Sequence, residues 1–384
     1  MGRVKSILKS WVRCCLYRFP IQKDKIVFIN YDGKGYGDNP KYIAEELLQQ
    51  NLSCKLVWLI KEDCYVPGQI KKVYYYSLSA YKELSTASVI ISNCKNNIPY
   101  YYKKKENQYY LQTWHGDFAL KYIEKEVEDI LSKGYVQASK ADSSVTDAVL
   151  SGNKQFSQIL KDSFWLPKQC EILEFGVPRN DVYFKGDEIK NIIKQKYGFS
   201  GEDKILLYAP TFRDYDVTSC YNIDFERLRN LLCQLSNENW KVVIRLHPNI
   251  SSKSGMFCYD KNIQNGSDFA DQQELCLISD CLITDYSSIM GDFLLMRKPV
   301  FLYAPDLEQY SDKTKGRGLR EMYFQLPFSM SRNQIELEWN ISQFDKVEYS
   351  ARLDAFMQDY YCSFDDGHAS ERVVNHLKEV IGFA

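Results

Sequence analysis

The sequence has no long hydrophobic run and almost no net charge, and each of these shortages excludes a class of protein. No run approaches the roughly 18 apolar residues that a membrane-spanning helix needs, so we expect no such helix, and no signal peptide with a cleavage site is evident. The net charge of −1 provides no overall basic surface for a nucleic acid. The 384 residues are enough for two or three domains, each with a large core.

The cysteines and glycines also lack the spacing that common cofactor sites require. Twelve cysteines are scattered without a C-x-x-C pair or a zinc-ligand pattern, and a chain of this length is no disulfide scaffold, so we expect a reducing cytoplasm. The loop from Gly33 to Gly37 follows G-x-G-x-G rather than G-x-G-x-x-G, and no acidic ribose-binding residue stands after a second strand. We therefore interpret it as a flexible loop at the carboxyl end of a strand.

Residues 1–25 combine an apolar helical face, which includes Trp11 and Phe19, with a series of cations and no acidic residue before Asp24. The cations considered for this helix are Arg3, Lys5, Lys9, Arg13 and Arg18. A basic amphipathic helix of this kind is typical of an interfacial membrane anchor. A first helix that packs on its own domain, with extended Lys and Arg side chains, is an equally good interpretation. Pro20 should end the helix in either case.

Short apolar runs alternate with helical stretches along the rest of the chain. This alternation predicts parallel α/β sheets, and it starts again after a boundary near residue 176. Residues 118–165 are the exception, because they look helical and polar, and we interpret Lys121, Lys125 and Lys133 as part of a solvated helical face. The predicted strands are 26–30, 55–60, 73–76, 89–92, 109–113 and 171–175 in the first half, and 205–208, 242–246, 281–283 and 299–303 in the second.

The segment from Cys281 to Phe293 predicts a strand, a hydroxyl-rich turn and a helix. The free N–H groups and the positive end of such a helix suit a phosphate, although serines at a helix start often serve only as caps. Polar side chains also follow the neighbouring strands, and the carboxyl ends of parallel strands converge on one crevice. We therefore predict an anion site. Its candidate groups are Thr211 and Arg213, Arg245 and His247, Thr284 to Ser288, and Tyr303 to Asp306.

His115 is one of only four histidines, and it stands at the end of a predicted strand directly before Gly116. That position suits a side chain that projects into a cleft. A purely structural histidine remains an open alternative.

Seven motifs, taken together, resemble the CDP-glycerol:glycerophosphotransferases of the teichoic-acid primase and polymerase type, including their CDP-ribitol relatives. The motifs occur in the order that this family has, and they cover about residues 26–380. They are Asp38-Asn39-Pro40-Lys41, Gln112-Thr113-Trp114-His115-Gly116, Gly176-Val177-Pro178-Arg179-Asn180-Asp181, Tyr208-Ala209-Pro210-Thr211-Phe212-Arg213, Arg245-Leu246-His247-Pro248, Thr284-Asp285-Tyr286-Ser287-Ser288 and Asp366-Gly367-His368-Ala369-Ser370-Glu371-Arg372.

The resemblance implies a GT-B-like α/β fold, in which two Rossmann-like doubly wound domains face a central cleft. We expect the basic helix at 1–25, an acceptor domain at 26–175, a CDP-alditol-binding domain at 176–365, and a terminal helix at 366–384 that packs back on the N-terminal domain. The implied reaction transfers glycerol phosphate or ribitol phosphate from a CDP-alditol to a hydroxyl of a lipid-linked or capsular glycan. CMP is released, and the product belongs to teichoic-acid or capsule polysaccharide synthesis.

The family also implies roles for single residues. The histidine of W-H-G, here His115, is taken as the general base, and such a base typically contributes about 10²–10⁴ when an alcohol is the nucleophile. Arg, His and hydroxyl groups stabilise phosphoryl charge. No D-x-D or acidic cluster stands at a strand end, and the family is similarly metal-independent, so we predict no obligatory metal and no cofactor besides the donor. The implied donor-binding residues are Arg179, Asn180, Thr211, Arg213, Arg245, His247, Asp285, Ser287, Ser288 and Arg317.

Two positions depart from the family pattern. Asp117-Phe118 stand where the family usually has Thr-Pro, so Asp117 is a second catalytic candidate that either orients His115 or changes the choice of acceptor. Arg317 lies in a Gly-Arg-Gly element that resembles the R-G-F element of the family without its aromatic part. Glycerol and ribitol therefore both remain open, and we expect a primase-length or capsule enzyme rather than a large polymerase.

Two other functions remain open: a GT-B glycosyltransferase that uses a nucleotide sugar, and a non-catalytic membrane-associated scaffold. The expected location is the cytoplasmic face of the cell membrane, with peripheral binding through residues 1–25. The expected partners are the CDP-alditol, the glycan acceptor and the membrane surface, and no nucleic acid.

Overall fold

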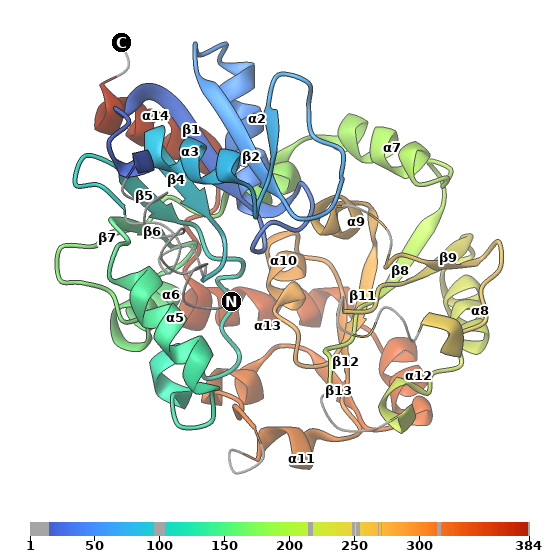
Figure 1. The fold of residues 1–384 in the computed structure, drawn as a ribbon. Coiled ribbons are helices and arrows are strands. Elements are labelled where there is room, and N and C mark those ends of the chain that lie inside the picture. Colours follow the sequence, from blue (N-terminus) through green and yellow to red (C-terminus); the bar gives the residue numbers. More distant parts are fainter. Residues whose placement is uncertain are drawn as a thin grey trace. The chain divides into compact units, whose positions relative to one another are not determined.

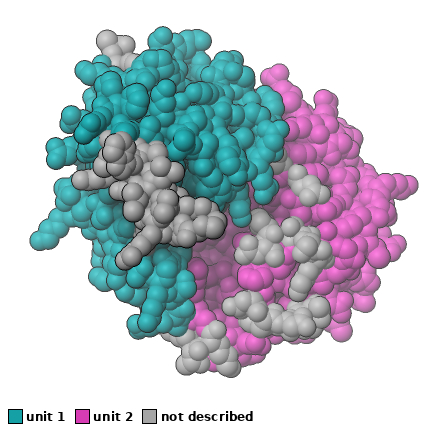
Figure 2. All heavy atoms as spheres, in the orientation of Figure 1, with its two compact units in different colours: residues 1–117, 124–181, 363–384 teal, residues 118–123, 182–362 magenta. Residues whose placement is uncertain are grey.

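The computed structural model describes residues 15–95, 104–213, 218–247, 250, 254–267, 269, 271–312 and 316–382. The chain forms two compact units, coloured separately in Figure 2. Unit 1 contains residues 1–117, 124–181 and 363–384, and unit 2 contains residues 118–123 and 182–362. None of the helices in these described ranges is both long and apolar enough to cross a membrane.

Unit 1 is built on a seven-stranded parallel sheet with the strand order β3-β2-β1-β4-β5-β6-β7 (Figure 1). Runs of Ile, Val and Phe are buried on both faces here, as expected for strands at the centre of a parallel sheet. The strands are β1 (Gln22–Ile29), β2 (Lys55–Ile60), β3 (Lys71–Tyr74), β4 (Ala87–Ser92), β5 (Tyr109–Gln112), β6 (Ala148–Leu150) and β7 (Glu171–Leu173). The helices are α2 (Asp38–Gln49), α3 (Leu78–Thr86), η1 (Glu124–Val127), α5 (Lys133–Ser143), α6 (Lys154–Ser163) and α14 (Ala369–Ile381), and η2 (Pro178–Phe184) starts in this unit.

The last helix completes the core of unit 1. Val373, Val374 and Leu377 of α14 are fully buried in one hydrophobic cluster with Phe28 of β1 and Trp58 of β2. The same cluster includes side chains of α2, and α14 packs against α2 (Figure 1). The opposite face of the sheet is covered by α3. Residues from both ends of the described chain therefore share one core.

Unit 2 is built on a six-stranded parallel sheet with the order β10-β9-β8-β11-β12-β13. Its strands are β8 (Lys204–Tyr208), β9 (Trp240–Ile244), β10 (Ile263–Asn265), β11 (Cys281–Thr284), β12 (Val300–Tyr303) and β13 (Ser329–Ser331). The helices and helical turns are α7 (Asp187–Lys196), η3 (Thr218–Tyr221), α8 (Phe225–Ser236), α9 (Gln272–Ile278), α10 (Ile289–Leu295), α11 (Leu307–Ser311), η5 (Glu321–Gln325), α12 (Gln334–Ser342), α13 (Lys346–Phe356) and the π-helical turn η6 (Met357–Tyr361).

The predicted α/β class with two Rossmann-like domains is confirmed, but residues 118–165 were predicted incorrectly as helical throughout. This region contains the short strand β6 between α5 and α6. It begins with residues 118–123, which we call the strap because they belong to unit 2 while the residues on either side belong to unit 1. Lys121 in the strap forms an antiparallel β-bridge with Leu319 instead of lying on a helix.

The observed units also differ from the sequence-based domain boundaries of 26–175 and 176–365. Residues 176–181 and 363–365 belong to unit 1, because Arg179 pairs with Asp38, and the carboxylate of Asp365 accepts from Val177 and Asn180. Most of the predicted N-terminal amphipathic helix lies outside the described residues. Its last turn is helical up to Tyr17, and Pro20 follows outside the helix, as expected for proline.

Candidate active site

The candidate base, His115, lies just after β5 in unit 1 and is half-buried. Trp114 before it has φ of +52°, a left-handed conformation that is unusual for a bulky residue and often marks a functional site. The side-chain oxygen of Gln112 holds this turn by accepting from the Trp114 N–H at 3.0 Å. The imidazole lies beside the ring of Trp114, with 4.3 Å between the centroids, and also near the ring of Tyr31.

A backbone carbonyl fixes the tautomer of His115. The Nδ1 atom lies 2.7 Å from the carbonyl oxygen of Asn93, which directly follows β4. A carbonyl oxygen can only accept, so Nδ1 must carry the proton and donate it, and Nε2 is left with the basic lone pair. Burial lowers the pKa of His115, and this effect outweighs the Asn93 carbonyl and Asp38, which raise it. The ring is therefore mostly neutral at pH 7.

A buried ion pair holds the His115 loop in place. Arg179 of η2 donates from Nη1 to the Oδ2 of Asp38 at 2.9 Å and to the backbone carbonyl of His115 at 3.0 Å. Its backbone N–H donates to the side chain of Asn39. Burial alone would raise the pKa of Asp38, but Arg179 and the N–H of Asn39 lower this pKa by more than burial raises it. The carboxylate therefore stays charged. Because only 4% of Arg179 is exposed, this geometry favours a positioning role over the predicted phosphate contact.

Asp117 and Asn180 belong to a second buried polar group of unit 1. The carboxylate of Asp117 accepts from Asn153, while Asn180 donates to Asp365 at 3.2 Å. Burial raises the pKa of Asp365 to about 8, and the nearby charge of Asp117 adds to this. Since the Nδ1 atom of His115 is bonded to Asn93, the group that orients the imidazole is that carbonyl and not Asp117.

In unit 2, Arg213 is the centre of a buried charge cluster. Its Nε and Nη2 atoms donate to the two oxygens of Asp306 at 3.0 and 2.9 Å, and its Nη1 atom donates to Asp285 and to the carbonyl of Thr211. The guanidinium also lies 5.0 Å from the ring centroid of Tyr286. With 5% exposure and most of its donors already used, Arg213 supports the site instead of presenting itself to a ligand.

Asp285 and Arg245, two further predicted ligands, are also occupied by the protein itself. The Asp285 carboxylate accepts from the backbone N–H groups of Thr211 and Tyr286. Arg245 donates from Nη1 to the backbone carbonyls of Gly266 and Phe269, both at 2.8 Å. These contacts fix the loops after β8, β9 and β11.

Four predicted donor-binding residues are accessible. Ser288 and Arg317 are exposed, Ser287 is half-buried, and the exposed imidazole of His247 stacks on Phe212. Ser288 stands at the N-cap of α10 without a side-chain capping bond, and Ser287 accepts from Ile289 only at 3.4 Å. Capping therefore leaves the Ser288 hydroxyl available for a ligand. Desolvation and then the ammonium of Lys121 lower the pKa of His247.

Lys121 and Asn93 are the site residues that the sequence interpretation missed. Lys121 was assigned to a solvated helix, but the strap places it in unit 2 beside Tyr310 and Leu319. Asn93 acts through its main chain, which its residue type cannot reveal.

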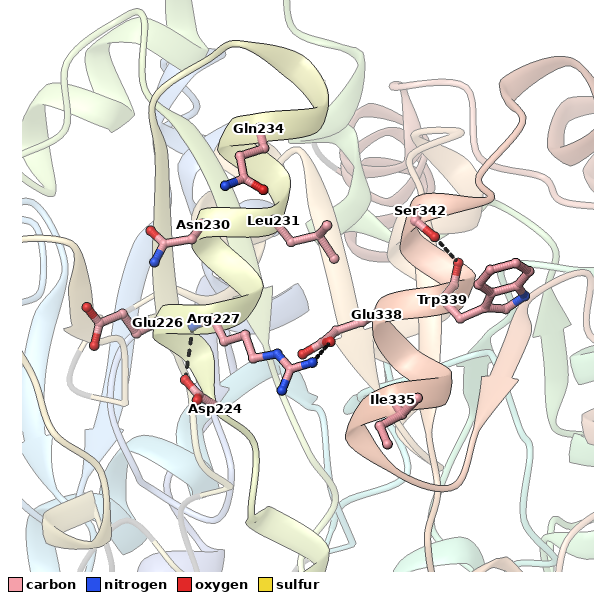
Figure 3. Close-up of a pocket in the computed structure, with 10 residues that line it drawn as sticks. All are labelled: Asp224, Glu226, Arg227, Asn230, Leu231, Gln234, Ile335, Glu338, Trp339 and Ser342. Carbon is pink, nitrogen blue, oxygen red and sulfur yellow. Dashed lines mark hydrogen bonds and ion pairs between the residues drawn. The ribbon is translucent and has the colours of Figure 1, made fainter.

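A pocket of about 640 Å³ lies on another part of unit 2, between α8 and α12 (Figure 3). Arg227 of α8 reaches Glu338 of α12, while the ring of Trp339 points away from α8. None of the predicted site residues lines this pocket. Within the described ranges, no group of three or more His, Cys, Asp or Glu side chains could hold a metal ion.

Comparisons with known proteins give the chain its relatives. It is 33% identical over 372 residues to the teichoic acid poly(glycerol phosphate) polymerase of Staphylococcus epidermidis. The matched region covers 92% of this chain but only 50% of that polymerase. It is 31% identical to the teichoic acid glycerol-phosphate transferase of Staphylococcus aureus, and that match covers 96% of this chain and 98% of the transferase. A solved structure of the wall teichoic acid polymerase TagF is 32% identical, with a TM-score of 0.85 over 99% of this chain and 96% of the other.

The family model of the CDP-glycerol:poly(glycerophosphate) glycerophosphotransferases matches residues 12–379, which is nearly the whole sequence. The chain belongs to this family.

Proposed function

We propose that this protein transfers an alditol phosphate, glycerol phosphate or ribitol phosphate, from a CDP-alditol to a hydroxyl of a lipid-linked or capsular glycan and releases CMP. The family supports the reaction class, and its relatives include teichoic acid glycerol-phosphate and ribitol-phosphate enzymes. A TagF variant soaked with CDPG is among the similar structures, at 31% identity. The product would be part of a teichoic acid or a capsule polysaccharide.

The observation that carries the proposal is the oriented, neutral imidazole of His115. An alcohol is a poor nucleophile at neutral pH, and a base with a free lone pair contributes about 10²–10⁴ to such a reaction. The Nε2 atom takes the proton of the acceptor hydroxyl, and the oxygen attacks the β-phosphorus of the donor. The bond between the β-phosphorus and the bridging oxygen breaks, and CMP leaves with that oxygen.

The donor diphosphate is bound, in this proposal, by the accessible groups of unit 2. Ser287 and Ser288 provide hydroxyl donors, while His247 and Arg317 provide N–H donors. Charge-assisted donors of this kind stabilise phosphoryl oxygens in the transition state. Because cationic side chains can supply this stabilisation, we infer that no metal is obligatory, and we expect CMP release to continue in excess EDTA. Loss of activity in EDTA and its recovery with Mg²⁺ would show that the inference is wrong.

The experiment that tests the function is CMP release by the purified chain. CDP-glycerol, CDP-ribitol and a UDP-sugar are compared as donors, with a membrane glycan acceptor, and His115→Ala is measured in parallel. We expect CMP from one CDP-alditol, nothing from the UDP-sugar, and a loss of about 10²–10⁴ in the variant. A chain that uses only the UDP-sugar would be a glycosyltransferase, and full activity of the variant would remove His115 as the base.

We also propose that the enzyme works at the cytoplasmic face of the cell membrane and binds it peripherally. The support is the basic amphipathic pattern of residues 1–25, of which residues 1–14 lie outside the described part of the structure. Flotation with anionic liposomes should recover the intact chain but not a variant with Arg3, Lys5 and Lys9 changed to Gln. Equal flotation of both would refute this attachment.

A further inference from the structure

The strap, residues 118–123, is tightly fixed within unit 2. A Cβ atom at Gly291 of α10 would lie 2.8 Å from the Cβ of Phe118, so only glycine allows the two segments to approach so closely. The ring of Phe118 also meets those of Phe356 and Tyr361 edge to face. The strap is therefore held against α10, the helix that begins directly after Ser288.

Hydrogen bonds from Arg320 to carbonyl groups of the strap continue this attachment through Lys121. The N–H of Arg320 donates to the carbonyl of Leu120 at 2.8 Å, and the Nε of Arg320 donates to the carbonyl of Lys121 at 3.1 Å. Lys121 also forms its β-bridge with Leu319, two residues after Arg317. The backbone of Lys121 thus has a defined position next to the Gly-Arg-Gly element.

The ammonium group of Lys121 lies among the donor-site groups. Its Nζ is 5.3 Å from the ring centroid of Tyr310, and the guanidinium of Arg213 is 5.4 Å from the same centroid. Tyr310 in turn stacks on Tyr286 with 3.7 Å between the centroids. Lys121 therefore shares an aromatic neighbour with the buried arginine of the site.

The charges around Lys121 are unbalanced. Burial, Arg317 and Arg213 together lower the pKa of Lys121 to about 8, although Asp285 opposes them. The carboxylates of Asp285 and Asp306 are both already bound to Arg213. Among the residues that the structure describes, no carboxylate forms an ion pair with Lys121. Like charges gathered at a partly buried position are costly unless an anion joins them.

We propose that Lys121 is a further ligand of the donor diphosphate, to which its ammonium donates together with Arg317, His247 and the two serines. This inference rests on the proposed function, because the diphosphate is that of the CDP-alditol. It adds a cation from the segment that directly follows the His115 loop in the sequence, and so from outside the strand-end motifs of unit 2.

The experiment compares the binding of CDP and of cytidine by calorimetry, because only CDP carries the diphosphate. The variants are Lys121→Met, which keeps the aliphatic stem, and Lys121→Arg, which keeps the charge. Lys125→Met is the control, because Lys125 is exposed in η1 of unit 1. We expect Lys121→Met to bind CDP roughly 10- to 100-fold more weakly, as for the loss of a charged hydrogen bond, with unchanged cytidine binding. Lys121→Arg should recover most of the affinity, and Lys125→Met should match the wild type.

Three results would overturn the proposal. Unchanged CDP binding by Lys121→Met would show that the ammonium does not contact the diphosphate. An equal loss for CDP and cytidine would show that Lys121 only supports the shape of the site. Failure of the wild type to bind CDP would remove both this inference and the proposed donor. If instead the wild type binds CDP but releases no CMP from a CDP-alditol, the proposed function fails, and the comparison of CDP with cytidine still decides the role of Lys121.

Discussion

Acidification should inactivate this enzyme through one side chain, His115. The base must be unprotonated at Nε2, and burial keeps its pKa below the ordinary value of 6.5. We therefore expect kcat/KM for the CDP-alditol to be constant near pH 7 and to fall as the pH drops through the pKa of His115. The decline should approach tenfold for each pH unit below that pKa, because one protonation removes the base.

The size of the effect can be checked by substitution. His115→Ala should lower kcat/KM by about 10²–10⁴, which corresponds to about 2.7–5.5 kcal/mol of transition-state stabilisation. The remaining activity of this variant should lose the acidic decline, since the titrating group is gone. The assay is CMP release in overlapping buffers of constant ionic strength, with thermal melts at each pH to exclude unfolding.

His368→Gln is the matched control, because His368 is exposed and contacts Glu371 instead of the His115 loop. Its profile should coincide with that of the wild type. Three results would refute the reasoning: an acidic decline centred above pH 7, activity that rises on acidification, or an unchanged decline in His115→Ala.

Three further predictions concern stability and binding. The pKa of Asp365 is raised in the folded chain, so between about pH 4 and pH 8 the folded chain keeps a proton that the unfolded chain has released. Stability should therefore fall as the pH rises through this window. Thermal melts at pH 5.5, 7 and 8.5 should show a smaller decline for Asp365→Asn, and parallel curves would contradict this assignment. Gly291→Ala should lower the stability of unit 2 by about 1–3 kcal/mol, because the added methyl group would overpack against the strap. Gly134→Ala should leave the stability unchanged, because Gly134 has open space around it. Equal melting temperatures of the two variants would refute the contact between Gly291 and the strap. Arg213→Met should lower the free energy of unfolding in urea by about 3–5 kcal/mol, because it leaves two buried carboxylates without their partner. Arg317→Met should instead raise the KM for the donor and leave the stability unchanged. The reverse pattern would exchange the two roles.

The longer strands could be predicted from the sequence because their signal is local, whereas the three-residue strands β10 and β13 were not predicted. Runs such as 26–29 and 205–208 are apolar at every position, which is typical of strands buried on both faces of a parallel sheet. Residues 118–165 could not be predicted in the same way, because short elements alternate there and β6 has only three residues. The strap is determined by tertiary contacts of Phe118 and Lys121, which no local pattern shows.

The motifs predict which loops carry the candidate site, but they do not show the partners of each side chain. Arg179 and Arg213 stand in sequence motifs that suggest phosphate ligands, yet each is bound by carboxylate and carbonyl groups of its own unit. A sequence shows that an arginine is present, but its partners come from distant segments, such as Asp38 for Arg179 and Asp306 for Arg213. The orientation of His115 likewise depends on a main-chain oxygen of Asn93.

The position of α14 in the unit 1 core has a consequence for biosynthesis. Residues 369–381 follow all of unit 2 in the sequence, so the apolar side chains of Phe28 and Trp58 lack part of their covering until the ribosome has passed unit 2. Unit 2, whose residues lie between 118 and 362, is fully synthesised before that covering arrives. Unit 1 therefore completes its core only after all of unit 2 has been synthesised, although β1 and β2 precede unit 2 in the sequence.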